Sequence, residues 1–176
     1  CHNTETADEA IIACNGLLET GGMSDEDYAS IHYHLGRALR DKGEPDQAID
    51  HYDEAIKLKP TADAYNHRGV AKYDKGEYQA AIDDYTEALK IKPSDADAIN
   101  NRAWTRYKAG DLAGALTDAN RAISLNGTKA YMYDTRGHIH EARGQRNAAI
   151  SDYRKALSLD RDTDSSAEGL RRLGVN

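Results

Sequence analysis

Histidines are the side chains in this sequence best suited to metal binding or acid–base chemistry, and there are seven of them. His32 and His34 are two residues apart, and the same spacing separates His138 from His140. On a helix, side chains two apart point about 200° away from each other, so neither pair can share an ion. No spacing of cysteines and histidines is typical of a zinc site. We therefore predict no metal site and no cofactor.

A run of aspartates near the C-terminus is similar to the start of a calcium-binding loop. Asp160, Asp162 and Asp164 alternate as such a loop requires. The loop then needs a glycine, where Ser165 stands, and a closing glutamate, where Arg171 stands. We therefore interpret the run as the start of a helix. The sequence also has no glycine-rich phosphate loop, nucleophile elbow or Ser–His–Asp grouping, so it predicts no catalytic residues and no enzyme.

The composition indicates a charged, water-exposed protein. Charged residues of both signs make up 30% of the chain, and the formal net charge is −7. This balance argues against binding nucleic acid or an anionic membrane through bulk charge. The apolar stretches, such as residues 10–13, are far too short to span a bilayer, so we expect no transmembrane segment.

The elements that position these side chains come from a four-fold internal repeat. A glycine recurs at spacings of 33, 34 and 34 residues, at Gly43, Gly76, Gly110 and Gly144. An alanine follows each of these glycines by five residues, at Ala48, Ala81, Ala115 and Ala149. A period near 34 residues with small residues at fixed offsets is typical of stacked helix pairs, each burying its apolar face against the next.

Each repeat contains two apolar runs at helical spacing with a short break between them. In the first repeat, Ile31, Leu35 and Leu39 lie in the first run, and Pro45 suits the first turn of the second helix. We predict repeats at residues 29–61, 62–95, 96–129 and 130–163, with capping helices in 1–28 and 164–176. The N-terminal cap is predicted as a helix over 6–18 and the C-terminal one as a helix that a capping box starts at Ser165.

The second repeat carries a family pattern in full. Residues 64–93 read AYNHRGVAKYDKGEYQAAIDDYTEALKIKP. The mid-helix glycine Gly69, the turn glycine Gly76, the A-x-x-x-Y motif ending at Tyr85 and the terminal Pro93 closely resemble the tetratricopeptide repeat. The resemblance covers residues 29–163. It implies an all-α, right-handed superhelical solenoid of antiparallel helix pairs, about four repeats long and capped at both ends.

The third repeat departs most from this pattern. Ala103 replaces the mid-helix glycine, and Ala119 replaces the aromatic residue of the second helix. These changes put the local packing around Ala119 in question, but not the architecture. Repeats two, three and four carry an arginine at the same position of the first helix, at Arg68, Arg102 and Arg136. We interpret them as structural partners of second-helix acids such as Asp84 and Asp118.

The resemblance implies that the first helices of successive repeats line a concave groove. Helical phase places one set of side chains on or near that face, and we predict that they bind the partner: Tyr33, His34, Arg37, Asn66, His67, Asn100, Asn101, Trp104, Tyr107, Tyr131, Asp134 and His138. Trp104 is the only tryptophan, and aromatic side chains in a partly dry cleft often carry binding energy. Alternatively, Trp104 only packs against Tyr73 or Tyr107. The lysines of the family's carboxylate clamp are not evident.

The two cysteines, Cys1 and Cys14, bear on the compartment. We expect them to form a disulfide that holds the N-terminus, worth about 3 kcal/mol in the chain-entropy model. The alternatives are a buried thiol at Cys14 with an incidental Cys1, or a lipid anchor on Cys1. The N-terminal stretch also resembles small exported tetratricopeptide proteins of bacteria, which implies a periplasmic or secreted protein whose signal peptide has been removed. A cytoplasmic location is the alternative.

Two functions follow from these expectations. The first is a non-catalytic protein–protein interaction module that binds a peptide segment or protein partner in the concave groove. The second is a structural subunit of a larger envelope assembly that docks through its convex face or its caps, with a homo-oligomer as one form of it. The fold alone does not choose between them.

Overall fold

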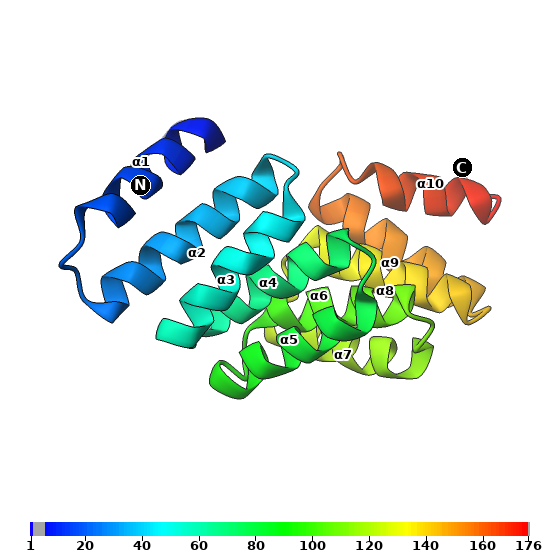
Figure 1. The fold of residues 1–176 in the computed structure, drawn as a ribbon. Helices are drawn as coiled ribbons and strands as arrows, with labels where there is room; N and C mark the ends of the chain where they lie inside the picture. Colours follow the sequence, from blue (N-terminus) through cyan, green and yellow to red (C-terminus); the bar gives the residue numbers. More distant parts are fainter. Residues whose placement is uncertain (2–5, 176) are drawn as a thin grey trace. The chain divides into compact units, whose positions relative to one another are not determined.

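The computed structural model describes Cys1 and residues 6–175, and these residues form ten helices and no strand (Figure 1). They divide into two compact units, Cys1–Pro93 and Ser94–Asn176. The first unit contains α1 (Ala7–Thr20), α2 (Asp25–Asp41), α3 (Pro45–Leu58), α4 (Ala62–Asp74) and α5 (Tyr78–Ile91). The second unit contains α6 (Ala96–Lys108), α7 (Leu112–Leu125), α8 (Ala130–Ala142), α9 (Arg146–Leu159) and α10 (Asp164–Arg172).

Within each unit, helices pack most closely against their neighbours along the chain. α2 packs with α3 and α4 with α5, while α6 packs with α7 and α8 with α9. α1 lies against α2, and α10 lies against both α9 and α8. Each pair turns at a glycine whose positive φ a residue with a Cβ rarely adopts: Gly43 (83°), Gly76 (79°), Gly110 (88°) and Gly144 (70°). The predicted all-α fold of consecutive helix pairs is confirmed.

A tyrosine ring lies against a glycine inside three of the four pairs. A Cβ placed on Gly36 would lie 2.7 Å from Cε1 of Tyr52. The corresponding distance is 2.8 Å between Gly69 and Tyr85, and a Cβ on Gly137 would clash with its tyrosine in the same way. Glycine therefore recurs in mid-helix because the partner ring fills the space of its side chain.

The third pair lacks both the ring and the glycine. Ala103 and Ala119 are fully buried and belong to one apolar cluster with Ala115 and Ile139. Ala119 stands where the other pairs have their tyrosine, so α7 places no ring over Ala103 and a methyl group fits there. The two departures from the repeat pattern thus compensate each other, and the packing around Ala119 is closed.

An arginine–aspartate pair joins the two helices in three of the four pairs. Arg68 donates from Nε and Nη2 to the two carboxylate oxygens of Asp84, at 2.9 and 2.6 Å. The same two-bond contact recurs between Arg102 and Asp118 and between Arg136 and Asp152. The three carboxylates are buried, and a buried charge needs such a partner. The predicted structural role of these arginines is confirmed.

The N-terminal cap is a helix held by a disulfide. Thr6 caps α1, and its hydroxyl and Glu9 form a reciprocal capping box. Cys14, which is fully buried, is bonded to Cys1 and packs against Ile31 and Leu35 of α2. The predicted pairing of the two cysteines is therefore confirmed.

The C-terminal cap begins differently from the prediction. α10 starts at Asp164, and its N-cap residue, Thr163, makes no side-chain capping bond. The capping box predicted at Ser165 is therefore wrong. The reason is tertiary: the hydroxyls of Ser165 and Ser166 donate to the carboxylate of Asp134 on α8, at 3.1 and 2.6 Å.

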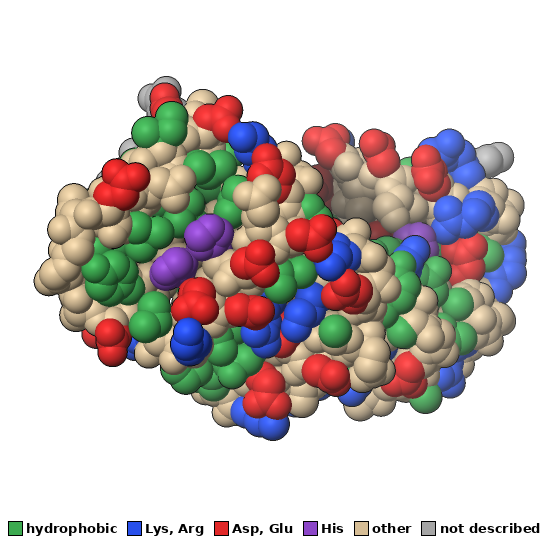
Figure 2. Space-filling model, viewed as in Figure 1, with side chains coloured by type: hydrophobic (Ala, Val, Ile, Leu, Met, Phe, Trp, Pro, Cys, Tyr) green, Lys and Arg blue, Asp and Glu red, His purple; other side chains and the backbone are tan. Residues whose placement is uncertain are grey.

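The surface carries charges of both signs. Figure 2 shows acidic and basic side chains interspersed over the visible face rather than gathered by sign. Among the described helices, none combines the length and the hydrophobicity that crossing a membrane requires.

Candidate functional site

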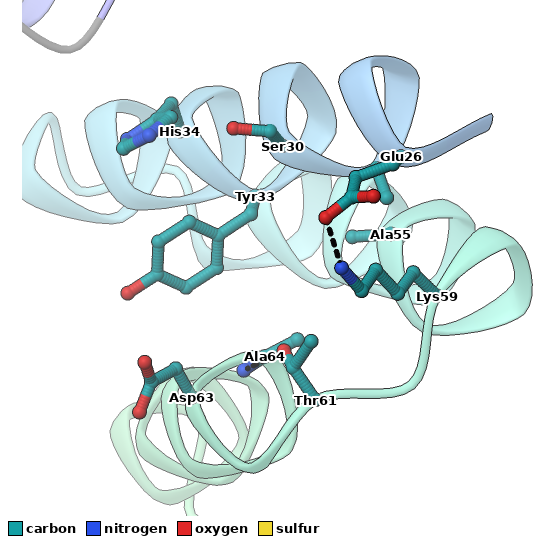
Figure 3. Close-up of a pocket in the computed structure, with 10 residues that line it drawn as sticks. Glu26, Ser30, Tyr33, His34, Ala55, Lys59, Thr61, Asp63 and Ala64 are labelled. Atoms are coloured by element: carbon teal, nitrogen blue, oxygen red, sulfur yellow. Dashed lines mark hydrogen bonds and ion pairs between the residues drawn. The ribbon is translucent and has the colours of Figure 1, made fainter. Parts of the chain in front are cut away.

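The first unit has a pocket of about 280 Å³ between α2 and α4 (Figure 3). It is lined by Glu26, Ala29, Ser30, Tyr33, His34, Ala55, Lys59, Thr61, Asp63 and Ala64. The ring of Tyr33 points from α2 toward α4, and Glu26 and Lys59 form an ion pair at one side. Two of the predicted binding residues, Tyr33 and His34, thus line one pocket.

Aromatic and basic side chains continue from Tyr33. The His67 ring of α4 packs edge-on against the Tyr33 ring, with centroids 5.3 Å apart, and the Arg37 guanidinium lies 6.0 Å from that ring's centre. His67 Nδ1 is 2.9 Å from the backbone oxygen of Asp63, and because a carbonyl only accepts, Nδ1 carries the proton. Burial lowers the pKa of His67 and raises that of Tyr33, so both are neutral at pH 7.

The second unit has a larger, more aromatic pocket of about 440 Å³. We call it the aromatic pocket, and it is lined by Trp104, Tyr107, Lys108, His138, Glu141, Ala142 and Arg172. The Trp104 ring lies 5.1 Å from the Tyr107 ring and meets the His138 ring edge-on at 5.5 Å. Three predicted binding residues from α6 and α8 thus converge here, and the expected alternative contact between Trp104 and Tyr107 is part of the same cluster.

The charges of the aromatic pocket lie at its edge. Lys108 is exposed, with Nζ 5.9 Å from the centre of the Trp104 ring. Arg172 of α10 donates to both carboxylate oxygens of Glu141, at 3.0 and 2.9 Å. Glu141 also accepts from the Tyr153 hydroxyl at 2.6 Å. These hydrogen bonds, led by that from Arg172, lower the pKa of Glu141, which is therefore ionised at neutral pH.

Tyr131 and Asp134, two further predicted residues, line a different hollow on α8 together with Thr163. Tyr131 donates its hydroxyl to Asp97 of α6, and burial raises its pKa. Asp134 accepts from both serines at the start of α10. Both side chains are thus used in contacts between helices of the second unit.

Asp134, His138 and Ser165 lie together but do not form a catalytic triad. His138 Nε2 is 2.7 Å from the Ser165 hydroxyl oxygen, and the Asp134 carboxylate is 3.7 Å from the same nitrogen. A triad needs the carboxylate on Nδ1 and an unprotonated Nε2 facing the serine. Because the Ser165 hydroxyl donates to Asp134, the hydrogen of the His138 contact comes from Nε2, which is then no base for this serine.

The three predicted asparagines differ in burial. Asn66 on α4 and Asn101 on α6 are half-buried. Asn100 is only 6% exposed, and its Oδ1 accepts no hydrogen bond from any described residue. A buried acceptor in that state is uncommon and costs free energy until a donor reaches it.

Sequence reasoning missed two features of these surfaces. Arg172 was not predicted because it lies on the capping helix, outside the repeats that set the phase of the groove. His32 and His51 were missed because they are 19 residues apart, yet their Nδ1 atoms lie 2.9 Å from each other across α2 and α3. Within the described part of the chain, no three His, Cys, Asp or Glu side chains are grouped to hold a metal ion.

Comparison with known families decides what kind of chain this is. Models of the tetratricopeptide repeat match residues 8–63, 33–96, 67–131 and 130–163. The chain belongs to the tetratricopeptide repeat family. No curated protein matches the sequence at a significant level.

Solved structures of tetratricopeptide proteins are similar over most of the chain. MamA is 26% identical with a TM-score of 0.77, over 90% of this chain and 91% of that one. The first such domain of Spaghetti (RPAP3), bound to the HSP90 peptide SRMEEVD, is 27% identical with a TM-score of 0.62, over 64% and 90%. YrrB, described as having an unusual peptide-binding site, is 17% identical with a TM-score of 0.76, over 94% and 84%, and shows the fold alone. The neighbours support a protein-interaction module in general terms.

Proposed function

We propose that this chain is a non-catalytic protein-interaction module whose first helices hold a peptide segment of a partner. The observation that carries the proposal is the convergence of Trp104, Tyr107 and His138 around a cavity of about 440 Å³. Tryptophan and tyrosine in a partly dry hollow are common carriers of binding energy. In a protein without a ligand, three such rings at the edge of a cavity leave apolar surface for a partner to cover.

Two further observations support a peptide as the partner. The tetratricopeptide domain of Spaghetti (RPAP3), 27% identical to this chain, is solved with a bound HSP90 peptide. In this chain, the predicted groove also carries the half-buried amides of Asn66 and Asn101, a group that can both donate to and accept from a peptide backbone. The predicted groove residues of the first unit, with Tyr33 and His34 at their pocket, would form a second contact surface for the partner.

The absence of catalysis is part of the proposal. It is supported by the arrangement of Asp134, His138 and Ser165, which lacks the geometry of an acyl-transfer site. We also propose that the protein works in an oxidising compartment, the bacterial periplasm or the cell exterior. The Cys1–Cys14 disulfide supports this location, and it occupies the same sulfur that a lipid on Cys1 would use. Alkylating free thiols in intact source cells before lysis tests this location. If the disulfide is formed in the cell, neither Cys1 nor Cys14 should take up the reagent.

The experiment that tests peptide binding compares two variants against a display library of random peptides. Asn101→Ala/Trp104→Ala removes side chains from the predicted groove, and Leu125→Ala removes an exposed apolar side chain at the end of α7. We expect the peptides that bind the wild type to bind Leu125→Ala equally and to lose at least about tenfold in affinity for the double variant. If both variants bind the peptides as tightly as the wild type does, the interface lies away from the groove.

The second candidate is a structural subunit that docks through its second helices. It is favoured by the exposed apolar side chains at the ends of α7 and α9, Leu125 and Leu159, which are 46% and 38% exposed. Sedimentation over a range of concentrations tests self-association. Growth of the particle with concentration, abolished by Leu125→Ala/Leu159→Ala, is the result that this candidate requires.

A further inference from the structure

The aromatic pocket has walls of a fixed shape. Its His138 ring is held by the Ser165 hydroxyl at 2.7 Å and packs edge-on against Tyr153, with centroids 5.3 Å apart. Tyr153 is in turn fixed between Gly137 and Gly169, and its hydroxyl donates to Glu141. Because the supporting side chains are themselves locked, a ligand need not order them on binding.

The volume of this pocket sets what can enter. A cavity of about 440 Å³ lies at the lower end of the range in which proteins bind small ligands. It is large enough for one bulky side chain of a peptide together with a short stretch of its backbone. The rings of Trp104 and Tyr107 offer that side chain an apolar surface.

The edge of the pocket has an unmatched positive charge. Lys108 forms no ion pair with any described residue, whereas Arg172 and Glu141 neutralise each other through their two-bond contact. Lys108 is exposed, so its charge at the edge of this hollow is available to a ligand. Charge complementarity therefore favours a carboxylate next to the side chain that enters the pocket.

The position of Lys108 also excludes a cationic ligand. An aromatic pocket can bind a positively charged group over the face of its tryptophan. Here the Lys108 ammonium already lies 5.9 Å from the centre of the Trp104 ring. A second cation at that face would be repelled by the first, which favours a ligand with an anionic group beside an apolar one.

We propose, on the basis of the function proposed above, that the aromatic pocket binds a peptide segment in which a large apolar side chain lies next to a carboxylate. The apolar side chain enters between Trp104, Tyr107 and His138, and the carboxylate pairs with Lys108. The second-unit capping helix completes the site through Arg172, which holds Glu141 and keeps it from opposing the ligand's charge.

The protein carries its own reporter for this test. Trp104 is its single tryptophan, so the intrinsic fluorescence of the full chain reports directly on the aromatic pocket when peptides without tryptophan are titrated. Three short synthetic peptides carry Leu–Glu, Leu–Gln or Ala–Glu at their centre. Each is made with a free and with an amidated C-terminus, which separates a side-chain carboxylate from a chain-end carboxylate.

A matched lysine provides the control variant. Lys155 in the same unit lies 5.9 Å from the centre of the Tyr133 ring, the same distance that separates Lys108 from Trp104. For the wild type and Lys155→Gln, we expect the Leu–Glu peptide to bind about tenfold more tightly than the amidated Leu–Gln and the Ala–Glu peptides. In Lys108→Gln, the preference for Glu over Gln should fall to about twofold or less, and in the wild type it should weaken as salt is added.

The C-terminus of the peptide and the Lys108 variant separate the remaining outcomes. Tight binding of Leu–Gln only with a free C-terminus would support the same pocket with the chain end as the carboxylate. Equal titration of Leu–Glu and amidated Leu–Gln, or a Glu preference that survives in Lys108→Gln, would overturn this inference but leave peptide binding in place. If no peptide changes the Trp104 fluorescence and the random library also yields no binder, the proposed function fails as well.

Discussion

The pair α2–α3 in the first unit and the pair α8–α9 in the second share one packing solution and differ in their polar contacts. In both, a buried tyrosine ring lies over a glycine, Tyr52 over Gly36 and Tyr153 over Gly137. The Tyr153 hydroxyl donates to Glu141, whereas the buried Tyr52 hydroxyl has no hydrogen-bond partner among the described residues. The repeat therefore preserves shape, and each copy satisfies its polar groups separately.

The buried charge pair shows the same difference. α8–α9 is joined by Arg136 and Asp152. At the corresponding positions of α2–α3 stand Leu35 and His51, and His51 instead contacts His32 with Nδ1 atoms 2.9 Å apart. One pair is thus held by a charge-assisted contact and the other by a contact between two neutral rings.

The largest expected effect comes from removing the acceptor of the charge pair. Asp152→Ala leaves the half-buried Arg136 without its carboxylate, which should cost about 3 kcal/mol or more. His51→Ala at the corresponding position should cost only about 1 kcal/mol. Urea unfolding followed by circular dichroism measures both. Equal losses would mean that the two contacts contribute alike and that the comparison fails.

The glycine under the tyrosine ring gives the next effect. Gly137→Ala forces the Tyr153 ring out of its place and should destabilise by about 2 kcal/mol. Ala103→Gly in the third pair, where Ala119 replaces the tyrosine of the second helix, should cost only about 1 kcal/mol through helix propensity. Thermal unfolding of the two variants checks the ranking, and a harmless Gly137→Ala would show that the ring has room to move.

The tyrosine hydroxyls should differ in the sign of their effect. Tyr153→Phe loses a hydrogen bond to a carboxylate and should destabilise by about 1 kcal/mol. Tyr52→Phe removes a buried hydroxyl to which no described residue is hydrogen-bonded, so it should be neutral or slightly stabilising. The difference between the two urea midpoints is the measurement. Destabilisation by Tyr52→Phe of the same size would reveal a partner for that hydroxyl.

The smallest effect is a pH dependence of the first unit. Burial lowers the pKa of His32 and of His51, so the folded state binds fewer protons than the unfolded state just below pH 6.5. Their contribution to stability is fully present above that pH and is lost as the pH falls. The slope is at most about 1.4 kcal/mol per pH unit for each proton, and less here because both rings are only half-buried and water screens part of the effect.

The control for this dependence is His32→Gln/His51→Gln. Its urea midpoint should change less between pH 7.5 and pH 5 than that of the wild type, because the two rings no longer titrate. Some change should remain, because other half-buried histidines such as His67 titrate in both proteins. An identical change in the two proteins would show that the contact between the two rings does not respond to protonation.

The sequence predicted the helix pairs because their cause is local. A ring needs a glycine opposite it, and a buried aspartate needs an arginine on the facing helix, so both recur with the period of the repeat. It did not predict the contact between His32 and His51, which replaces the repeating pair and depends on how two helices cross. The predicted start of α10 was wrong because the Ser165 hydroxyl donates to Asp134 rather than capping its own helix. Arg172 reaches the aromatic pocket only through that tertiary placement.

The disulfide has a practical consequence for anyone who prepares this protein. Cys14 packs on the apolar side chains of Ile31 and Leu35, and Cys1, which is bonded to it, packs against the same cluster. Reducing agents in purification buffers, or synthesis in a reducing cytosol, would leave this disulfide unformed and let α1 detach from α2. The exposed apolar face of α2 would then promote aggregation, so samples are best produced by export and handled without thiols.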